Sequence, residues 1–243
     1  MLRCLGLVYD YNYQDSKIST GIVGLDAILF GGIPKNNQVL LTGPAGTGKT
    51  LLSFEILYRN AKEKRPCTFI TFDEHRASLL ENVKGAFSDF DDIEELIAKN
   101  IMTVSEHRLL EAYGTRENFE AFISGLNKTI RLNNSQIVVI DSISPIRPLF
   151  DDDRIVTRAI NFLAENFKNL GVTAFFTHEV YNASNIIDDL LGTYMFDGLI
   201  KLNTLGEEGS FQFLTRVVKM RGTDHSNVSM PYEITPNGIN IFR

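Results

Sequence analysis

Short apolar runs alternate along the chain with longer stretches in which apolar residues recur every three or four positions. The apolar runs are typical of buried strands and cover residues 38–42, 67–72, 101–104, 137–140 and 172–177. Stretches with helical spacing lie near residues 49–64, 76–87, 116–131 and 151–170. Because strands and helices alternate, the pattern predicts an α/β fold with a mainly parallel sheet that is flanked by helices.

The last part of the chain has a different pattern. From Gly198 to Arg243, strand-like runs recur without helices between them, and Gly206 and Gly209 flank a predicted hairpin turn. We therefore expect these residues to form an antiparallel extension of the same sheet. Because no linker divides the chain, the sequence predicts an N-terminal extension over residues 1–17 and a single domain over residues 18–243.

Composition and charge place the chain among ordinary globular proteins. Hydrophobic residues make up 44% of it and charged residues 22%. No apolar run reaches the roughly 18 residues that a membrane-spanning helix needs, and the first ten residues lack the pattern of a signal peptide. We therefore expect a cytoplasmic protein without membrane insertion. The formal net charge of −6 argues against a surface that broadly attracts nucleic-acid phosphates.

The cysteines and histidines predict neither a disulfide framework nor a zinc site. Cys4 and Cys67 are too few for a framework, and Cys67 lies in an apolar run that predicts burial. The four histidines show none of the paired spacings typical of zinc ligands.

A phosphate-binding motif follows the first predicted core strand and begins the helix after it. Residues 43–50 read Gly-Pro-Ala-Gly-Thr-Gly-Lys-Thr, which fits the P-loop pattern G-x-x-x-x-G-K-[ST]. The glycines allow backbone N–H groups to converge on phosphate oxygens at the positive end of a helix. We expect Lys49 to reach the β and γ phosphates of ATP and the Thr50 hydroxyl to bind Mg²⁺. The predicted nucleotide-binding residues are Gly43, Pro44, Ala45, Gly46, Thr47, Gly48, Lys49, Thr50 and Leu51.

A carboxylate ends the apolar run at residues 137–140. In a parallel α/β sheet, the carboxyl ends of the strands form the edge where ligands bind. Asp141 is therefore the second predicted Mg²⁺ ligand, although an acidic residue at this position can also cap a turn. Ser142 and Ser144 follow it, and they either orient water or nucleotide or cap the next turn.

The acidic pair Asp73 and Glu74 ends the strand after the P-loop helix, at the same predicted edge. A carboxylate there can reach a water molecule that faces the γ phosphate, so Glu74 is the candidate general base and Asp73 its candidate partner. The alternative is that both residues only cap the helix that follows them.

These motifs together resemble the KaiC-like and RadA-like ATPases of the RecA superfamily. The resemblance covers residues 18–242 and includes the opening signature at residues 19–26 and 31–34. The acidic pair, the end of the Walker B strand at Asp141 and the segment Phe196-Asp197-Gly198 are similar to further family motifs. Residues 218–225 resemble a KaiC segment whose lysine and arginine enter the nucleotide site of the neighbouring subunit, which corresponds to Lys219 and Arg221 here.

The resemblance implies a RecA-like core that binds and hydrolyses ATP with Mg²⁺ and uses turnover as a conformational switch. It also implies a homo-oligomer, either a ring, a hexamer in particular, or a filament, with nucleotide at the subunit interfaces. KaiC has two such domains and phosphorylates itself, whereas this chain has one. Thr193 and Tyr194 precede the Asp197 region where the kinase domain of KaiC carries neighbouring serine and threonine acceptors.

The positions of Lys219 and Arg221 agree with a catalytic role. Residues two apart on a strand point to the same face, so two cations can meet the phosphate charge that develops during hydrolysis. The alternative is a solvated edge strand, on which lysine is common.

Two other classes of function remain open. A DNA-dependent recombinase or helicase relative would place its DNA loops near residues 144–153 and 179–194, but Arg147 is the only basic residue in both. A non-hydrolysing ATP sensor, similar to the motor-associated KaiC-like proteins of archaeal motility, would bind nucleotide to control docking to a partner. Glu74, Lys219 and Arg221 favour turnover over this sensor role.

Overall fold

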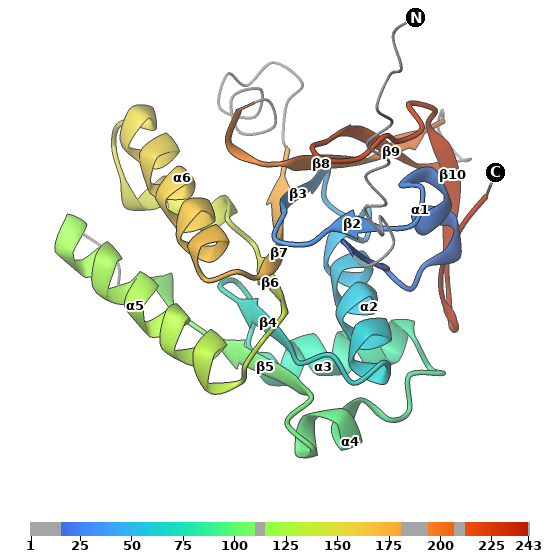
Figure 1. Ribbon diagram of the computed structural model, residues 1–243, viewed down its shortest axis with the longest axis horizontal. Helices are drawn as coiled ribbons and strands as arrows, with labels where there is room; N and C mark the ends of the chain where they lie inside the picture. Colours follow the sequence, from blue (N-terminus) through green and yellow to red (C-terminus); the bar gives the residue numbers. More distant parts are fainter. Residues whose placement is uncertain (1–15, 110–114, 181–193, 207–211, 243) are drawn as a thin grey trace, which may run out of the picture.

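A nine-stranded mixed sheet forms the centre of the protein in a computed structural model that describes residues 16–109, 115–180, 194–206 and 212–242. The strand order is β11-β10-β9-β8-β3-β7-β6-β4-β5 (Figure 1). The strands are β3 (Gln38–Gly43), β4 (Cys67–Thr71), β5 (Met102–Glu106), β6 (Ile137–Asp141), β7 (Thr173–Glu179), β8 (Gly198–Leu205), β9 (Gln212–Met220), β10 (Met230–Thr235) and β11 (Gly238–Ile241). A separate pair joins β1 (Lys17–Ile18) to β2 (Ile33–Pro34).

The sheet has a parallel half and an antiparallel half. Strands β5, β4, β6, β7, β3 and β8 pair in parallel, whereas β8, β9, β10 and β11 pair antiparallel. This arrangement confirms the predicted fold class. Strands β8 and β9 form the predicted hairpin, although Gly209 of its turn lies outside the described residues. Cys4 and most of the proposed N-terminal extension, residues 1–15, also lie outside them.

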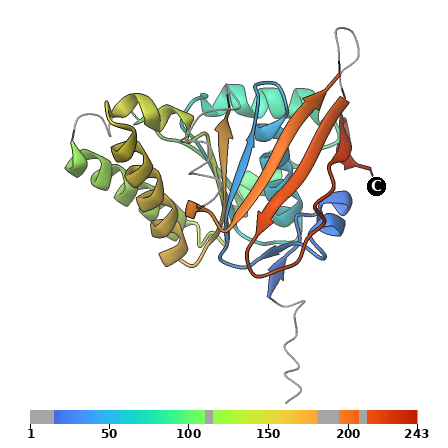
Figure 2. The same ribbon diagram turned by 90° about the horizontal axis from the view of Figure 1, so that it is seen from above.

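Helices cover both faces of the sheet, with α5 and α6 on one side and α2 and α3 on the other (Figures 1 and 2). The helices are α1 (Val23–Ile28), α2 (Lys49–Lys62), α3 (Arg76–Ala86), α4 (Ile93–Ala98), α5 (Arg116–Leu132) and α6 (Asp153–Asn169), with the short 3₁₀ helix η2 (Ser144–Leu149). No helix in the described residues is long and apolar enough to cross a membrane.

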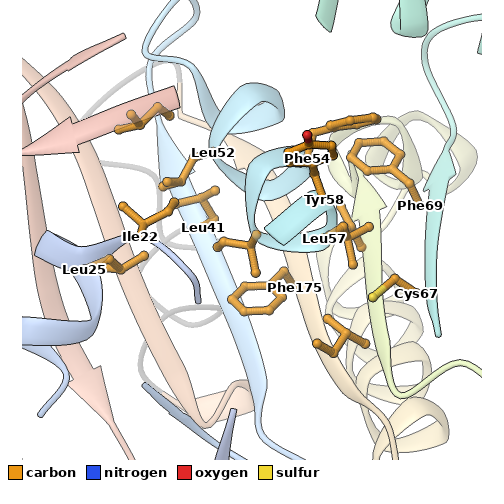
Figure 3. Packing of buried hydrophobic residues seen from close by; sticks show 14 of the residues in the cluster. Ile22, Leu25, Leu41, Leu52, Phe54, Leu57, Tyr58, Cys67, Phe69 and Phe175 are labelled. Carbon is orange, nitrogen blue, oxygen red and sulfur yellow. The ribbon is translucent and has the colours of Figure 1, made fainter. Parts of the chain in front are cut away.

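The strands alternate side chains between two apolar clusters, as the pleat of a sheet requires. Val39 and Leu41 of β3 join the cluster under α2, whereas Leu40 between them joins the cluster under α5 and α6. Figure 3 shows Phe54, Leu57 and Tyr58 of α2 packed against neighbouring strands. Cys67 is buried as predicted, and burial raises the pKa of its thiol to about 12.

Two of the described α-helices were not predicted. Helices α1 and α4 have six residues each, which is too short for a helical repeat of apolar positions to stand out. The predicted helix at 151–170 begins two residues later than expected, because the Asp152 side chain accepts a hydrogen bond from the Arg154 N–H and caps it.

Candidate nucleotide-binding site

The P-loop joins the end of β3 to the start of α2, at the edge where the parallel strands end. Gly46 and Gly48 have φ angles of +76° and +77°, in the left-handed region that favours glycine. Gly48 caps α2, whose first turn carries no acidic residue. The loop and the positive end of α2 therefore form a site suited to an anion.

Side chains hold the loop in its curved form. The Thr47 hydroxyl donates to the Pro44 carbonyl oxygen at 2.8 Å, and Thr47 is fully buried. The Lys49 ammonium donates to the carbonyl oxygens of Gly43 at 2.9 Å and Pro44 at 2.8 Å. Burial lowers the pKa of Lys49, while the negative charges of Glu179 and Asp141 oppose this shift. Leu51, on the first turn of α2, packs against the apolar cluster below the loop.

The two predicted metal ligands lie in contact. The Thr50 hydroxyl donates to Asp141 Oδ2 at 2.9 Å, and the Thr177 hydroxyl donates to the other carboxylate oxygen. Burial raises the pKa of Asp141 most, while the two hydroxyls and the charge of Lys49 oppose this shift. A buried carboxylate beside a hydroxyl is an all-oxygen donor set, which fits a hard cation such as Mg²⁺.

The members of the acidic pair point in different directions. Asp73 accepts a hydrogen bond from the Ser142 hydroxyl at 2.7 Å, directly after the Walker B strand. Partial burial raises the pKa of Asp73 most, and the charge of Glu179 adds to this, while Ser142 opposes it. Glu74 instead accepts a hydrogen bond from the Asn82 amide in α3. Asp73 therefore faces Asp141 in this structure, and Glu74 faces α3.

Glu179 is a further carboxylate at this edge, beyond the three that the sequence motifs indicated. Strand β7 extends two residues beyond its predicted end, and Glu179 lies opposite Gly43 in the parallel register. The backbone N–H of Glu179 donates to the Ser144 hydroxyl at 3.0 Å, and His178 also contacts that hydroxyl. A carboxylate after an apolar run, the signal that identified Asp141, could also have identified Glu179.

Lys219 and Arg221 lie close to each other, but they are distant from the P-loop of their own chain along the direction of the strands. The Lys219 ammonium donates to the Phe196 carbonyl oxygen at 2.7 Å, and the Arg221 guanidinium lies 3.4 Å from Asp197 Oδ1. Met220 between them pairs with Gly198, which in turn pairs with Val39 at the start of β3. The four residues from there to Gly43 span about 13 Å, so the structure does not bring these cations to the P-loop of the same chain.

The fold and this edge define a P-loop protein of the α/β class, and sequence comparison gives the family. A family model described as "ATPase: KaiC" matches residues 18–243. The chain therefore belongs to the KaiC ATPase family.

Individual relatives agree with this assignment. A UPF0273 protein of Methanopyrus kandleri is 34% identical over 236 residues, which cover 93% of this chain and 91% of that protein. The circadian clock oscillator protein KaiC of a Picosynechococcus species is 30% identical over 228 residues, but this chain spans only 44% of its length. A crystal structure of a KaiC-like protein from Pyrococcus horikoshii superposes with a TM-score of 0.79 at 27% identity, covering 93% of this chain and 99% of that one.

Proposed function

We propose that this protein binds Mg²⁺–ATP at the P-loop and hydrolyses it, and that a homo-oligomer uses the turnover as a conformational switch. The observation that carries the proposal is the contact between Thr50 and Asp141 beside a complete P-loop. A nucleoside triphosphate with its metal ion is the ligand for which this combination of anion site and oxygen ligands is suited.

The residues of the P-loop would bind the phosphates, and Thr50 and Asp141 would hold the metal ion. Bound there, Mg²⁺ would supply positive charge that offsets the negative charge of the phosphates during hydrolysis. Lys49 already lies at the loop carbonyls, so its ammonium needs only a side-chain rotation to meet an entering phosphate. Backbone N–H groups would supply the remaining donors.

Hydrolysis also requires a group that orients water and accepts its proton. Glu74 is our candidate, and we propose that its carboxylate leaves Asn82 when nucleotide is bound. Asp73 would remain on Ser142 and orient the water from the other side. A side-chain rotation of Glu74 would then separate the resting protein from the active one.

The position of Lys219 and Arg221 supports action across a subunit boundary. Both residues lie level with the start of β3, whereas their own P-loop follows the end of that strand. We therefore propose that they contact the nucleotide of a neighbouring subunit. Such a head-to-tail contact closes into a ring when the rotation between subunits closes, and we propose a hexameric ring.

Phosphate release by the purified protein tests the proposal, with Lys49→Ala as the site variant. We expect Mg²⁺-dependent release by the parent protein and loss of detectable ATP binding in Lys49→Ala, because the variant lacks the cation that meets the β and γ phosphates. Equal nucleotide affinity in both proteins would refute the site assignment. Single-stranded DNA should leave the rate unchanged, and strong stimulation would favour the recombinase or helicase class.

One observation favours the alternative of a non-hydrolysing ATP sensor. The Glu74 carboxylate is engaged by Asn82, so the candidate base does not face the P-loop in this structure. Saturable ATP binding without phosphate release, in the parent protein and in Glu74→Gln alike, would show that the protein is a non-hydrolysing ATP sensor instead.

A further inference from the structure

A buried tyrosine in the C-terminal strands contacts the backbone of the P-loop. Tyr232 of β10 is 4% exposed, and its ring stacks on Phe213 of β9 with centroids 5.3 Å apart. Its hydroxyl donates to the Thr47 carbonyl oxygen at 2.5 Å. None of the motifs that identified the nucleotide site contains this residue.

The hydrogen bond fixes the direction of one peptide group in the loop. The peptide between Thr47 and Gly48 is trans, so its C=O and N–H groups point in opposite directions. Because the carbonyl points at Tyr232, the N–H of Gly48 points away from β10. In a P-loop the backbone N–H groups on that side converge on the bound phosphate.

A second contact brings the same strand against the loop. A Cβ atom built at Gly48 would lie 2.8 Å from Ile234 Cδ1, so β10 packs directly against the loop. The Thr47 hydroxyl donates to the Pro44 carbonyl oxygen and not to the carbonyl oxygen of its own residue. The orientation of the Thr47 carbonyl therefore depends on Tyr232.

We propose that Tyr232 is a positioning residue, whose hydroxyl holds the N–H of Gly48 in the direction needed for phosphate before ATP arrives. This inference rests on the proposed binding of ATP at the P-loop. Without the hydroxyl, the loop must be reordered when nucleotide binds, which weakens the affinity. Chemistry after binding uses other groups, so the turnover number at saturating ATP stays close to that of the parent.

Tyr232→Phe removes the hydroxyl and keeps the ring against Phe213. We expect the Kd and KM for ATP to rise about 10-fold, equivalent to about 1.4 kcal/mol, with kcat within about twofold of the parent. In the nucleotide-free protein, hydrogen–deuterium exchange should become faster in peptides that contain the P-loop. This second measurement needs no nucleotide.

Tyr58→Phe is the matched control. Tyr58 is also 4% exposed, and its hydroxyl donates to Asp92 Oδ1 at 2.6 Å from the distal half of α2. Both variants lose one hydrogen bond of a buried tyrosine ring, to a part-buried acceptor for Tyr58 and to a buried one for Tyr232, so a general loss of stability should affect both. We expect Tyr58→Phe to keep the parent's affinity for ATP and its exchange rate at the P-loop.

The results separate this inference from the proposed function. If Lys49→Ala loses ATP binding while Tyr232→Phe binds as tightly as the parent, only the role of Tyr232 is overturned. An equal loss of affinity in Tyr232→Phe and Tyr58→Phe would also overturn it, because the effect would then be general. If the parent protein shows no saturable binding of ATP, the proposed function fails and the inference fails with it.

Discussion

Mixing two inactive variants tests whether Arg221 acts on a neighbouring subunit. Arg221→Ala removes a cation that we expect to stabilise only the transition state, so ATP should still bind while turnover falls by about 10³-fold or more. Glu74→Gln keeps the size of the side chain but removes the base, and its turnover should fall by about 10²-fold or more. Each variant alone should therefore form inactive assemblies.

The activity expected for the mixture follows from the position of Arg221 in the sheet and from random assembly of the two variants. Because Arg221 lies about 13 Å or more along the sheet from its own P-loop, it can complete only the site of another subunit. A complete site forms where an Arg221→Ala subunit, with intact Glu74, faces a Glu74→Gln subunit, with intact Arg221. In an equal mixture with random assembly, about one quarter of head-to-tail interfaces have this arrangement, so about a quarter of the parent activity should return.

Phosphate release at saturating ATP, measured across mixing ratios, is the assay. The recovered activity should be greatest at equal amounts and fall toward zero at either extreme. Exchange of subunits is confirmed separately by native mass spectrometry of size-tagged variants. If mixed assemblies form and every ratio stays as inactive as the components, Arg221 does not act in trans and our reason for proposing a ring is lost.

Two further predictions concern buried carboxylates. Burial raises the pKa of Asp141, so its contribution to stability is present below the unfolded pKa of about 3.9 and is lost as pH rises through the folded value. Nucleotide-free Asp141→Asn should therefore be more stable than the parent toward urea, by a larger margin at pH 7 than at pH 4, and a smaller margin at pH 7 would contradict the upward direction of the pKa shift. Glu55 of α2 accepts hydrogen bonds from the Ile239 N–H at 2.7 Å and from Arg59. Glu55→Ala should cost about 2 to 4 kcal/mol of unfolding free energy, and Glu55→Gln, which keeps an acceptor for Ile239, should cost less.

The P-loop and the contact between its two candidate metal ligands could be predicted from sequence, because their geometry is local or follows from a general rule. The loop is continuous in the chain, and strands that run in parallel bring their carboxyl ends to one edge, which places Asp141 beside Thr50. The fold class could also be predicted, because the alternation of strands and helices is a local pattern in the sequence.

Other features of the site depend on contacts that no local pattern encodes. The sequence does not show how the side chains of two adjacent acidic residues are oriented. Only the folded structure shows that the Glu74 side chain turns toward Asn82. The distance of Arg221 from its own P-loop depends on the register of β8 against β3 and β9. Tyr232 lies in a strand of ordinary composition, and its role depends on a partner in a different part of the chain.

The hydrogen bond between Tyr232 and Thr47 also bears on the order in which the protein matures. The two residues are 185 positions apart, so the ribosome makes the P-loop long before it makes the strand that holds it. At about 5 to 20 residues per second, this interval is roughly 10 to 40 s. During that time the nascent chain carries a nucleotide motif whose backbone is not yet held in place. We therefore expect a nucleotide that binds the P-loop to stabilise the finished protein and to give little help to the growing chain.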